Sequence, residues 1–197
     1  MISFRNEHGA TLLVSLVILL ILLLSGLSLT NMTLMSAKAT ANAHSREMAL
    51  HAAEYALADA EADIENSRTT NSRSEIFSPL SNQGFLEGCG RGNSNLNQGL
   101  CFPSEPPGKP IWLTENIADP GANSPSVALG RFTGRSMPVG KGSLSSRLPR
   151  YIIELIKDTT VEQSAQPRYM YRITAIGFGT SDAAEAVVQS YYRKTSY

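Results

Sequence analysis

The sequence carries no net charge. Its 197 residues include 17 lysines and arginines and 17 aspartates and glutamates, so the formal net charge is zero. Because no basic excess draws the chain to phosphate groups, nucleic acid is not expected as a partner. The length fits a single domain with a modest core.

The sequence also has few residues that could support catalysis. Its three histidines are His8, His44 and His51, so none follows residue 51 to form a Ser-His or Cys-His dyad. No G-x-S-x-G or H-E-x-x-H pattern occurs. The segment PVGKGS fails as a phosphate loop, because Gly142 stands where the Walker pattern requires Ser or Thr. We therefore expect neither an enzyme nor a cofactor.

One group of residues has the spacing of metal ligands. Its four members follow one another at steps of three, four and three, which places them on one face of a helix. The same pattern is typical of an exposed helix that carries mixed charges as i,i+3 and i,i+4 pairs. A single helix also lacks the facing ligands of a bundle site, so we expect no metal. The four residues are His44, Glu47, His51 and Glu54.

Ionisable residues are absent between Ala10 and Leu29. This predominantly apolar run of about 20 residues is long enough to cross a ~30 Å hydrocarbon layer as a helix. Arg5 precedes the run, and by the positive-inside tendency this keeps the start of the chain in the cytoplasm and exports the rest. The sequence therefore predicts an apolar anchor joined to an exported body.

The helix is expected to continue well beyond the anchor. The segment from Ser36 to Glu65 is rich in alanine and contains neither Gly nor Pro, and alanine has the highest helix propensity. Counted from Ala10, this predicts one helix of about 55 residues, with Gly26 as its weakest point. The apolar positions expected to face a folded domain are Met48, Ala52, Tyr55 and Ala56.

The only two cysteines, Cys89 and Cys101, lie in the Gly- and Asn-rich stretch GCGRGNSNLNQGLC. Downstream of an export element, a disulfide in an oxidising compartment is favoured over free thiols. Closing this loop would stabilise the fold by roughly 3 kcal/mol in the chain-entropy model. No further ligands lie at zinc-binding spacing. We interpret the loop as a structural staple, with a surface-displayed interaction loop as the alternative.

The remaining chain divides into a loop-rich region and a strand-rich end. Residues 66–149 are rich in Ser, Asn, Gly and Pro, so long loops are expected, with short strands around Ile111–Leu113 and Val127–Phe132. The end is rich in β-branched and aromatic residues, which predicts three antiparallel strands with a turn at Gly177 and Gly179. Packed with one face against the helix, these strands give the fold class α+β. The three segments are Arg150–Lys157, Arg168–Ile176 and Ala186–Arg193.

Three stretches carry a family resemblance. A short leader ends in Gly9 before the apolar helix, the helix contains HAAEYALADAE, and the chain closes with YRITAIGFGT and AEAVVQSYYR. In these stretches the sequence resembles the PilX-type minor pilins of type IV pili and the related tip pseudopilin of type II secretion. The resemblance covers both ends of the chain, whereas residues 66–148 match no motif of that family.

The resemblance implies a pilin-like fold, with a long N-terminal helix packed on a C-terminal antiparallel sheet. A leader at 1–9 would precede a transmembrane or filament-core helix at 10–35, and the exported half of that helix would follow at 36–65. The loop-rich region at 66–149 would hold the disulfide loop. The strands at 150–197 would complete the sheet.

The resemblance also implies how the protein is processed and where it acts. Prepilin peptidase would cleave between Gly9 and Ala10, and Ala10 would be N-methylated. Before assembly the protein would be anchored in the bacterial inner membrane, with its C-terminus in the periplasm. It would then be incorporated into an extracellular pilus. Its implied partners are other minor pilins, the major pilin, the prepilin peptidase, the inner-membrane assembly platform and a tip adhesin.

The implied roles are initiation of pilus assembly, twitching motility and cell adhesion. Two alternatives stay open at this point. One is a pseudopilin of type II secretion, which shares the same features. The other is a generic single-pass, membrane-anchored periplasmic binding domain, which would keep its leader.

One position departs from the pattern of major pilins. These proteins carry Glu at the fifth mature position, and the fifth residue counted from Ala10 is Val14. A carboxylate without a partner amine is costly among apolar helices, so a subunit at the pilus tip gains from an apolar residue there. Because the tip pseudopilin also lacks this Glu, we expect the protein at or near the tip. The alternative is that Val14 only lengthens the apolar segment.

Overall fold

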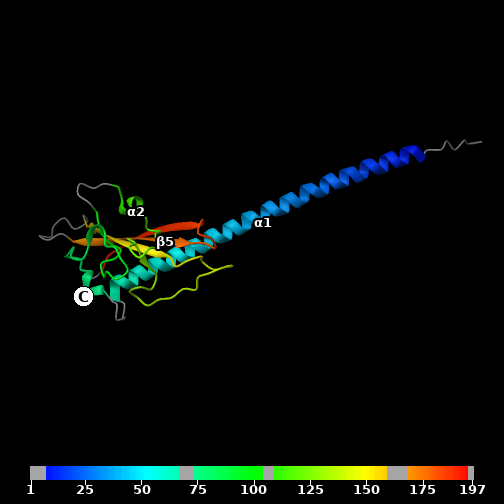
Figure 1. Ribbon diagram of the computed structural model, residues 1–197. Coiled ribbons are helices and arrows are strands. Elements are labelled where there is room, and N and C mark those ends of the chain that lie inside the picture. The colour runs from blue at the N-terminus through cyan, green and yellow to red at the C-terminus, as the bar shows by residue number, and fades with distance from the viewer. Residues whose placement is uncertain (1–7, 67–72, 104–108, 159–167, 195–197) are drawn as a thin grey trace, which may run out of the picture. The chain divides into compact units, whose positions relative to one another are not determined.

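The chain forms two compact units, Met1–Ala43 and His44–Tyr197, in a computed structural model. Helix α1, His8–Asn66, contributes residues to both units (Figure 1). All strands belong to the second unit. The structure describes residues 8–66, 73–103, 109–158 and 168–194.

The long helix predicted from the sequence is confirmed. α1 has 59 residues and continues without interruption through Gly26, the position expected to be weakest. Its alanine-rich second half and the absence of internal proline favour a helix of this length. One continuous element therefore contains both the apolar run and the segment that meets the sheet.

The three strands predicted at the C-terminal end are also confirmed. β4 (Arg150–Lys157), β5 (Tyr169–Phe178) and β6 (Glu185–Tyr192) pair antiparallel, β4 with β5 and β5 with β6. Their β-branched and aromatic side chains favour extended backbone on a half-buried surface. With the long helix they give an α+β fold, as expected.

The loop-rich region contributes three further strands to the same sheet. β1 (Leu86–Cys89) and β2 (Leu100–Phe102) extend it from β4 in parallel pairs, and β3 (Val127–Ala128) pairs antiparallel with β4. The order is β1-β2-β4-β5-β6, with β3 beside β4 off that path. The sheet is therefore mixed, and the sequence predicted only its antiparallel part.

The two short strands expected in this region need correction. Ile111–Thr114 is a short helix, α2, rather than a strand. Pro110 precedes it with a φ of −52°, which suits the entry to a helical turn. The other strand stops at Ala128 instead of Phe132, because Gly130 takes a φ of 81° and turns the chain.

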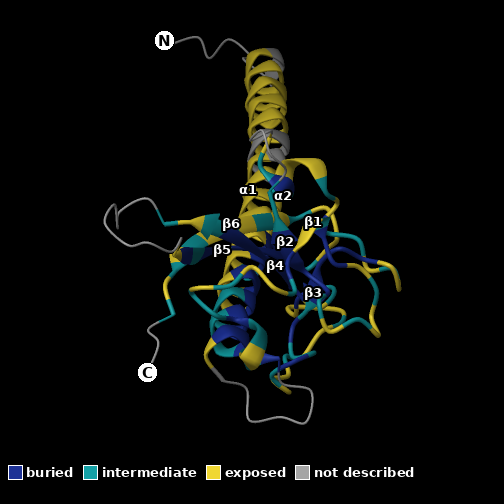
Figure 2. Cartoon of the chain, turned by 90° about the vertical axis from the view of Figure 1, so that its left-hand side faces the viewer, coloured by how far each residue is buried: buried dark blue, intermediate teal, exposed yellow. Residues whose placement is uncertain are grey.

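The second half of α1 packs against one face of the sheet. Ala56, Ala60 and Ile64 are fully buried and share a core with side chains of β4 and β5. Figure 2 shows dark blue segments in this part of α1, among teal and yellow ones, beside the strands. Small side chains on the helix let it approach the large aromatic and β-branched residues of the sheet, including Tyr151 and Tyr171.

The face of α1 that meets the sheet differs in part from the predicted one. Ala52 and Ala56 are buried as predicted, but Tyr55 is 38% exposed. Ala49 and Ala53 are fully buried instead. The buried face is thus made of alanines, and Tyr55 lies to one side of it because successive residues of a helix are turned by about 100° about its axis.

β5 comes so close to α1 that only glycine fits at the contact. A Cβ atom on Gly177 would lie 2.2 Å from the carbonyl oxygen of Ala49 and 2.3 Å from the amide nitrogen of Ala53. One on Gly179 would lie 2.3 Å from the carbonyl oxygen of Ser45. The turn predicted at Gly177 is wrong, since this residue lies within β5. Glycine is needed there for close contact with the helix.

The other face of the sheet carries a second core, which the sequence did not reveal. Ile152 of β4 and Ile176 and Phe178 of β5 are buried there against Ile111 of α2 and the segment that holds the two cysteines. The loop-rich region therefore covers this face of the sheet.

We expect Gly177→Ala to destabilise the protein by about 1–3 kcal/mol, because the backbone of α1 cannot move aside as a flexible side chain could. Denaturant unfolding of the full chain measures the change. Gly26→Ala is the control, since nothing lies within 4 Å of its Cβ position and alanine favours a helix. Unchanged stability of the Gly177 variant would contradict the close contact.

Candidate functional site

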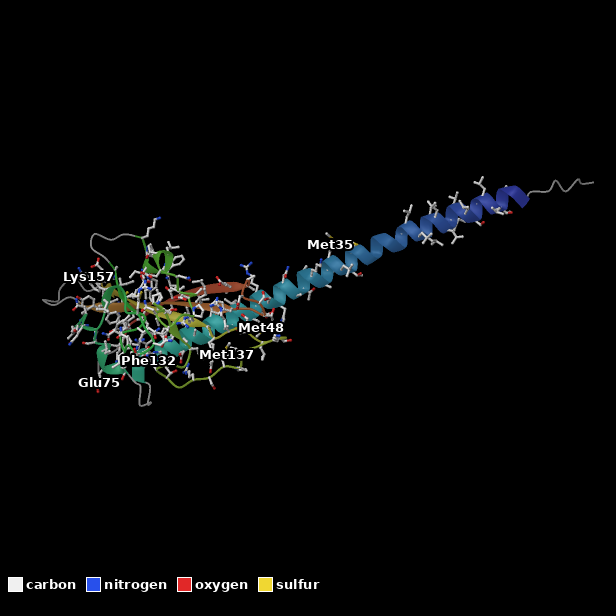
Figure 3. The ribbon with its side chains drawn as sticks, in the orientation of Figure 1. Met35, Met48, Glu75, Phe132, Met137 and Lys157 are labelled. Atoms are coloured by element: carbon white, nitrogen blue, oxygen red, sulfur yellow. A yellow bond between two sulfur atoms is a disulfide. The ribbon has the colours of Figure 1, made fainter. Side chains whose placement is uncertain are left out.

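The first half of α1 presents apolar side chains on every side. The nine consecutive residues from Leu16 to Leu24 are all Leu, Ile or Val, and each is exposed, by between 45% for Val17 and 66% for Leu23. Figure 2 shows this part of the helix in yellow, and Figure 3 shows its side chains pointing outward around the ribbon. A helix that is apolar all round is stable only where water is excluded. This surface is therefore the candidate functional site.

Two hydroxyl groups in this half of α1 are satisfied within the helix. Ser15 donates to the carbonyl oxygen of Leu12 at 2.9 Å, and Ser25 donates to that of Ile21 at 2.8 Å. Such bonds to the preceding turn remove the main cost of placing serine in an apolar environment. The serines thus fit a surface that packs against other helices.

Over the part of the chain that the structure describes, no helix has the combination of length and apolar character needed to cross a membrane.

The residues expected to be processed lie at the start of α1. Gly9 and Ala10 fall in its first turn, and Val14 lies about one turn further on with an exposed side chain. Val14 also lines a shallow depression on the helix surface, together with Ala10 and Ile18. Residues 1–7 of the expected leader lie outside the described residues.

The structure contains the predicted disulfide. Cys89 of β1 and Cys101 of β2 are partners in neighbouring strands, with their Cα atoms 4.0 Å apart. Both are buried and belong to the second core, on the face of the sheet opposite α1. The burial of the disulfide favours a structural role for it. The loop between them displays Arg91, which pairs with Glu115, and the exposed side chain of Leu96.

Two members of the group with metal-ligand spacing, Glu47 and Glu54, lie beside His51 in the structure. Nδ1 of His51 lies 3.3 Å from Oε2 of Glu54, and its Nε2 lies 3.8 Å from Oε1 of Glu47. These are the i,i+3 and i,i+4 contacts of an exposed helix surface, and His44 has no part in them. Within the described ranges, no three His, Cys, Asp or Glu side chains are grouped so that they could hold a metal ion.

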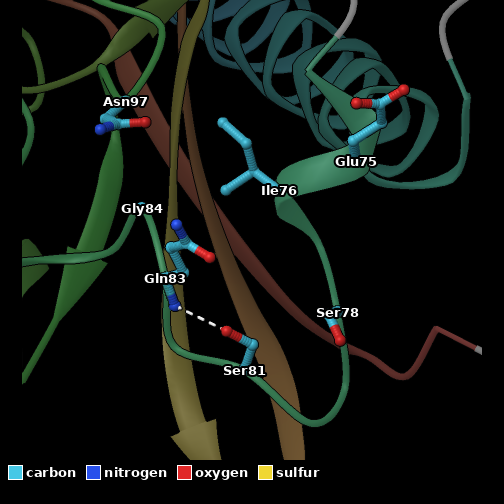
Figure 4. Close-up of a pocket in the computed structure, with 7 residues that line it drawn as sticks. All are labelled: Glu75, Ile76, Ser78, Ser81, Gln83, Gly84 and Asn97. Carbon is cyan, nitrogen blue, oxygen red and sulfur yellow. Dashed lines mark hydrogen bonds between the residues drawn. The ribbon is translucent and has the colours of Figure 1, made fainter.

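A surface hollow of ≈ 430 Å³ lies between the 3₁₀ turn Ser74–Ile76 and the start of β1. Figure 4 shows Ile76 pointing into it and the backbone N–H of Gln83 donating to Oγ of Ser81, at 3.1 Å. Among the described residues that line it, Glu75 is the one ionisable group. The lining residues of the hollow are Glu75, Ile76, Ser78, Ser81, Gln83, Gly84 and Asn97.

A buried ion pair ties α1 to the loop-rich region, and the sequence did not reveal it. Oδ2 of Asp63 accepts from the guanidinium of Arg73 at 2.7 Å, and both side chains are fully buried. Nη1 of Arg73 also donates to the carbonyl oxygens of Leu96 and Gln98. The hydroxyl of Tyr151 donates to Asp63 at 2.9 Å. Burial, with the Asp63 charge beside it, raises the pKa of Tyr151 well above its usual value.

A second acidic residue of α1 holds the chain after β3. Oδ2 of Asp59 accepts from the amide of Gly130 at 2.8 Å, and its other oxygen accepts from the hydroxyl of Thr133. Burial raises the pKa of Asp59, and the two hydrogen bonds oppose this shift. Asp59 and Asp63 therefore fix the loop-rich region against the C-terminal end of α1.

Two family models match the chain. One, described as PilX N-terminal, matches residues 8–58, and the other, described as Type IV pilus assembly protein PilX C-term, matches residues 62–194. The chain belongs to the PilX family. No curated protein and no solved structure matches it. The second PilX model extends through residues 66–148, a stretch with no recognisable motif of that family.

Membership of the PilX family supports a minor pilin of a type IV pilus. The members of this family are structural components of the pilus, and the family is not one of enzymes. The first model covers the exposed apolar half of α1 and the buried alanines as far as Ala56, whereas the second covers the sheet, the disulfide and Arg73. The candidate site and the body that carries it are therefore both PilX features.

We expect Arg73→Ala in this PilX-family chain to lower the free energy of unfolding by about 3–5 kcal/mol, because it leaves the buried Asp63 without its partner. Denaturant titration of the full chain measures the loss. Arg91→Ala is the matched control, since its ion pair with Glu115 lies at the surface and should contribute less than about 1 kcal/mol. Equal effects of the two substitutions would show that the buried pair is not needed.

Proposed function

We propose that this chain is incorporated into a type IV pilus at or near its tip and helps to initiate pilus assembly with other minor pilins. The exposed apolar surface of α1 carries the proposal. No ionisable residue occurs from Ala10 to Leu29, and the apolar side chains from Leu12 to Leu24 face every direction. Such a helix gains from burial among several apolar helices at once, as in the core of a filament.

The proposed route to the pilus begins at the membrane. Prepilin peptidase would remove residues 1–9, and the new amino terminus at Ala10 would be methylated. Until assembly the protein would be held in the inner membrane with its C-terminal unit in the periplasm, beside the assembly platform. The disulfide between Cys89 and Cys101 supports an oxidising compartment for that unit.

Val14 supports the position at the tip. Its side chain is one of a continuous apolar set, and a carboxylate there would be buried among neighbouring helices in a filament. A shaft subunit can pair such a carboxylate with the amino terminus of an adjacent subunit, whereas a subunit that assembles first has no earlier neighbour to supply the amine. An apolar residue at this position avoids the cost.

Mass spectrometry of the mature N-terminus tests the assignment to the pilus pathway. The chain recovered from sheared pili should begin at methylated Ala10. Gly9→Leu should block cleavage and leave the chain out of the sheared fraction. A wild-type chain that begins at Met1 in cells with normal pili would refute the proposed pathway.

The tip position is tested by Val14→Glu. A carboxylate at this position should let the chain pair with a neighbouring amino terminus and appear along the shaft, as immunogold labelling of sheared pili would show. Val17→Glu is the matched control, because it adds the same charge one turn away from the fifth mature position. Tip-restricted labelling of the Val14 variant, or equal redistribution of both variants, would contradict the role given to Val14.

A further inference from the structure

β6 is an open edge of the sheet. It stands at the end of the strand order, and within the described residues it pairs only with β5. Its eight residues pair with β5 without a register shift and contain no proline or glycine. A regular edge of this kind presents free N–H and C=O groups to another strand.

The opposite edge of the sheet is protected in a way that β6 is not. β1 has four residues, and its register shifts twice around Gly88. Short length and bulges are the usual means by which proteins prevent pairing at an edge. β6 has neither of them.

The side chains of β6 are arranged symmetrically about Gln189. On the outer face, Val187 and Tyr191 are two residues before and after it, and they are 48% and 63% exposed. Glu185, the first residue of β6, and Arg193, the residue that follows its end, are four residues before and after it and have opposite charges. If two such strands pair antiparallel about Gln189, each residue meets the one on the other side of the centre.

We propose that β6 binds β6 of a second copy of this chain, antiparallel and centred on Gln189. In this register Val187 of each copy lies opposite Tyr191 of the other, and β-branched residues pair favourably with aromatic ones across strands. Glu185 of each copy lies opposite Arg193 of the other. The pairing therefore buries the exposed apolar side chains and joins opposite charges at both ends.

Glu185 and Arg193 each keep part of their side chains exposed for this contact. Glu185 lies 3.5 Å from Arg147 and stays 43% exposed, and a pair of this kind is weak and exchanges partners at little cost. Arg193 lies 2.8 Å from Asp158, which is buried, so Arg193 keeps this partner and meets Glu185 of the other copy with the part of its side chain that is exposed. A parallel pairing would instead place Glu185 beside a second Glu185, and like charges opposite each other oppose association.

A second copy is favoured as the occupant because the strand complements itself. The contact is isologous, so it closes on itself and forms a dimer. Filament growth needs heterologous contacts, which must come from other surfaces such as α1. A single pair of strands belongs to the small and transient class of interfaces, so the dimer should form at high local concentration.

Cysteine cross-linking of the full chain in mild detergent tests the proposal. Gln189→Cys places two thiols opposite each other at the centre, where the Cα separation suits a disulfide. Glu185→Cys is the matched control, because its two copies would lie about 27 Å apart along the strands. The native cysteines are joined to each other and do not compete. Under mild oxidation we expect at least tenfold faster dimer formation for Gln189→Cys.

Two further variants test the register and the apolar contact. A mixture of Glu185→Cys and Arg193→Cys chains should cross-link to each other faster than either does to itself. Val187→Lys added to Gln189→Cys should slow dimer formation several-fold, whereas Leu96→Lys, at a similarly exposed residue away from β6, should not. Equal rates for Gln189→Cys and Glu185→Cys would overturn the proposal. So would equal effects of the two lysine substitutions.

Discussion

The close contact between α1 and the sheet is the constraint on which the folded unit depends. At Gly177 the backbone of β5 meets the backbone of α1 at Ala49 and Ala53, with no side chain between them. A larger residue on either side would separate the helix from the strands and open voids under the aromatic residues of the core, and packed interiors tolerate few voids.

A helix face made of alanine buries little apolar area, so polar contacts set its position. Ser45 accepts from the amide of Thr180, Asp59 holds the chain after β3, and Asp63 pairs with Arg73. A buried ion pair adds little net stability compared with an apolar pair of the same shape, but it is costly to break. A helix displaced by one residue would leave these carboxylates buried without partners. The polar contacts therefore specify the register of α1 against the sheet.

The sequence predicted correctly those elements that are determined by residues close together in the chain. The length of α1, the strands β4 to β6 and the disulfide follow from alanine content, β-branched runs and cysteine count. The pair of Asp63 and Arg73 could not be predicted, because it joins a helix to a loop and has no periodic signal. One hint was present, since Asp63 falls at the helical spacing of the buried residues Ala56 and Ala60. β1, β2 and α2 depend on the second core, on the face of the sheet opposite α1, and this core is formed by residues far apart in sequence.

The residues that keep the body folded and the residues proposed to drive assembly lie on the same helix but act separately. Exposed apolar surface costs about 25 cal/mol per Å², and the side chains from Leu16 to Leu24 are exposed on every side of α1. The core against the sheet is built instead from alanines and Ile64, together with the acidic residues that fix the register. A change at Val14 therefore alters what the helix can pack against, whereas a change at Asp63 alters whether the body holds its shape. Because the two effects arise at different residues, a defect in assembly can be separated from a defect in folding within one chain.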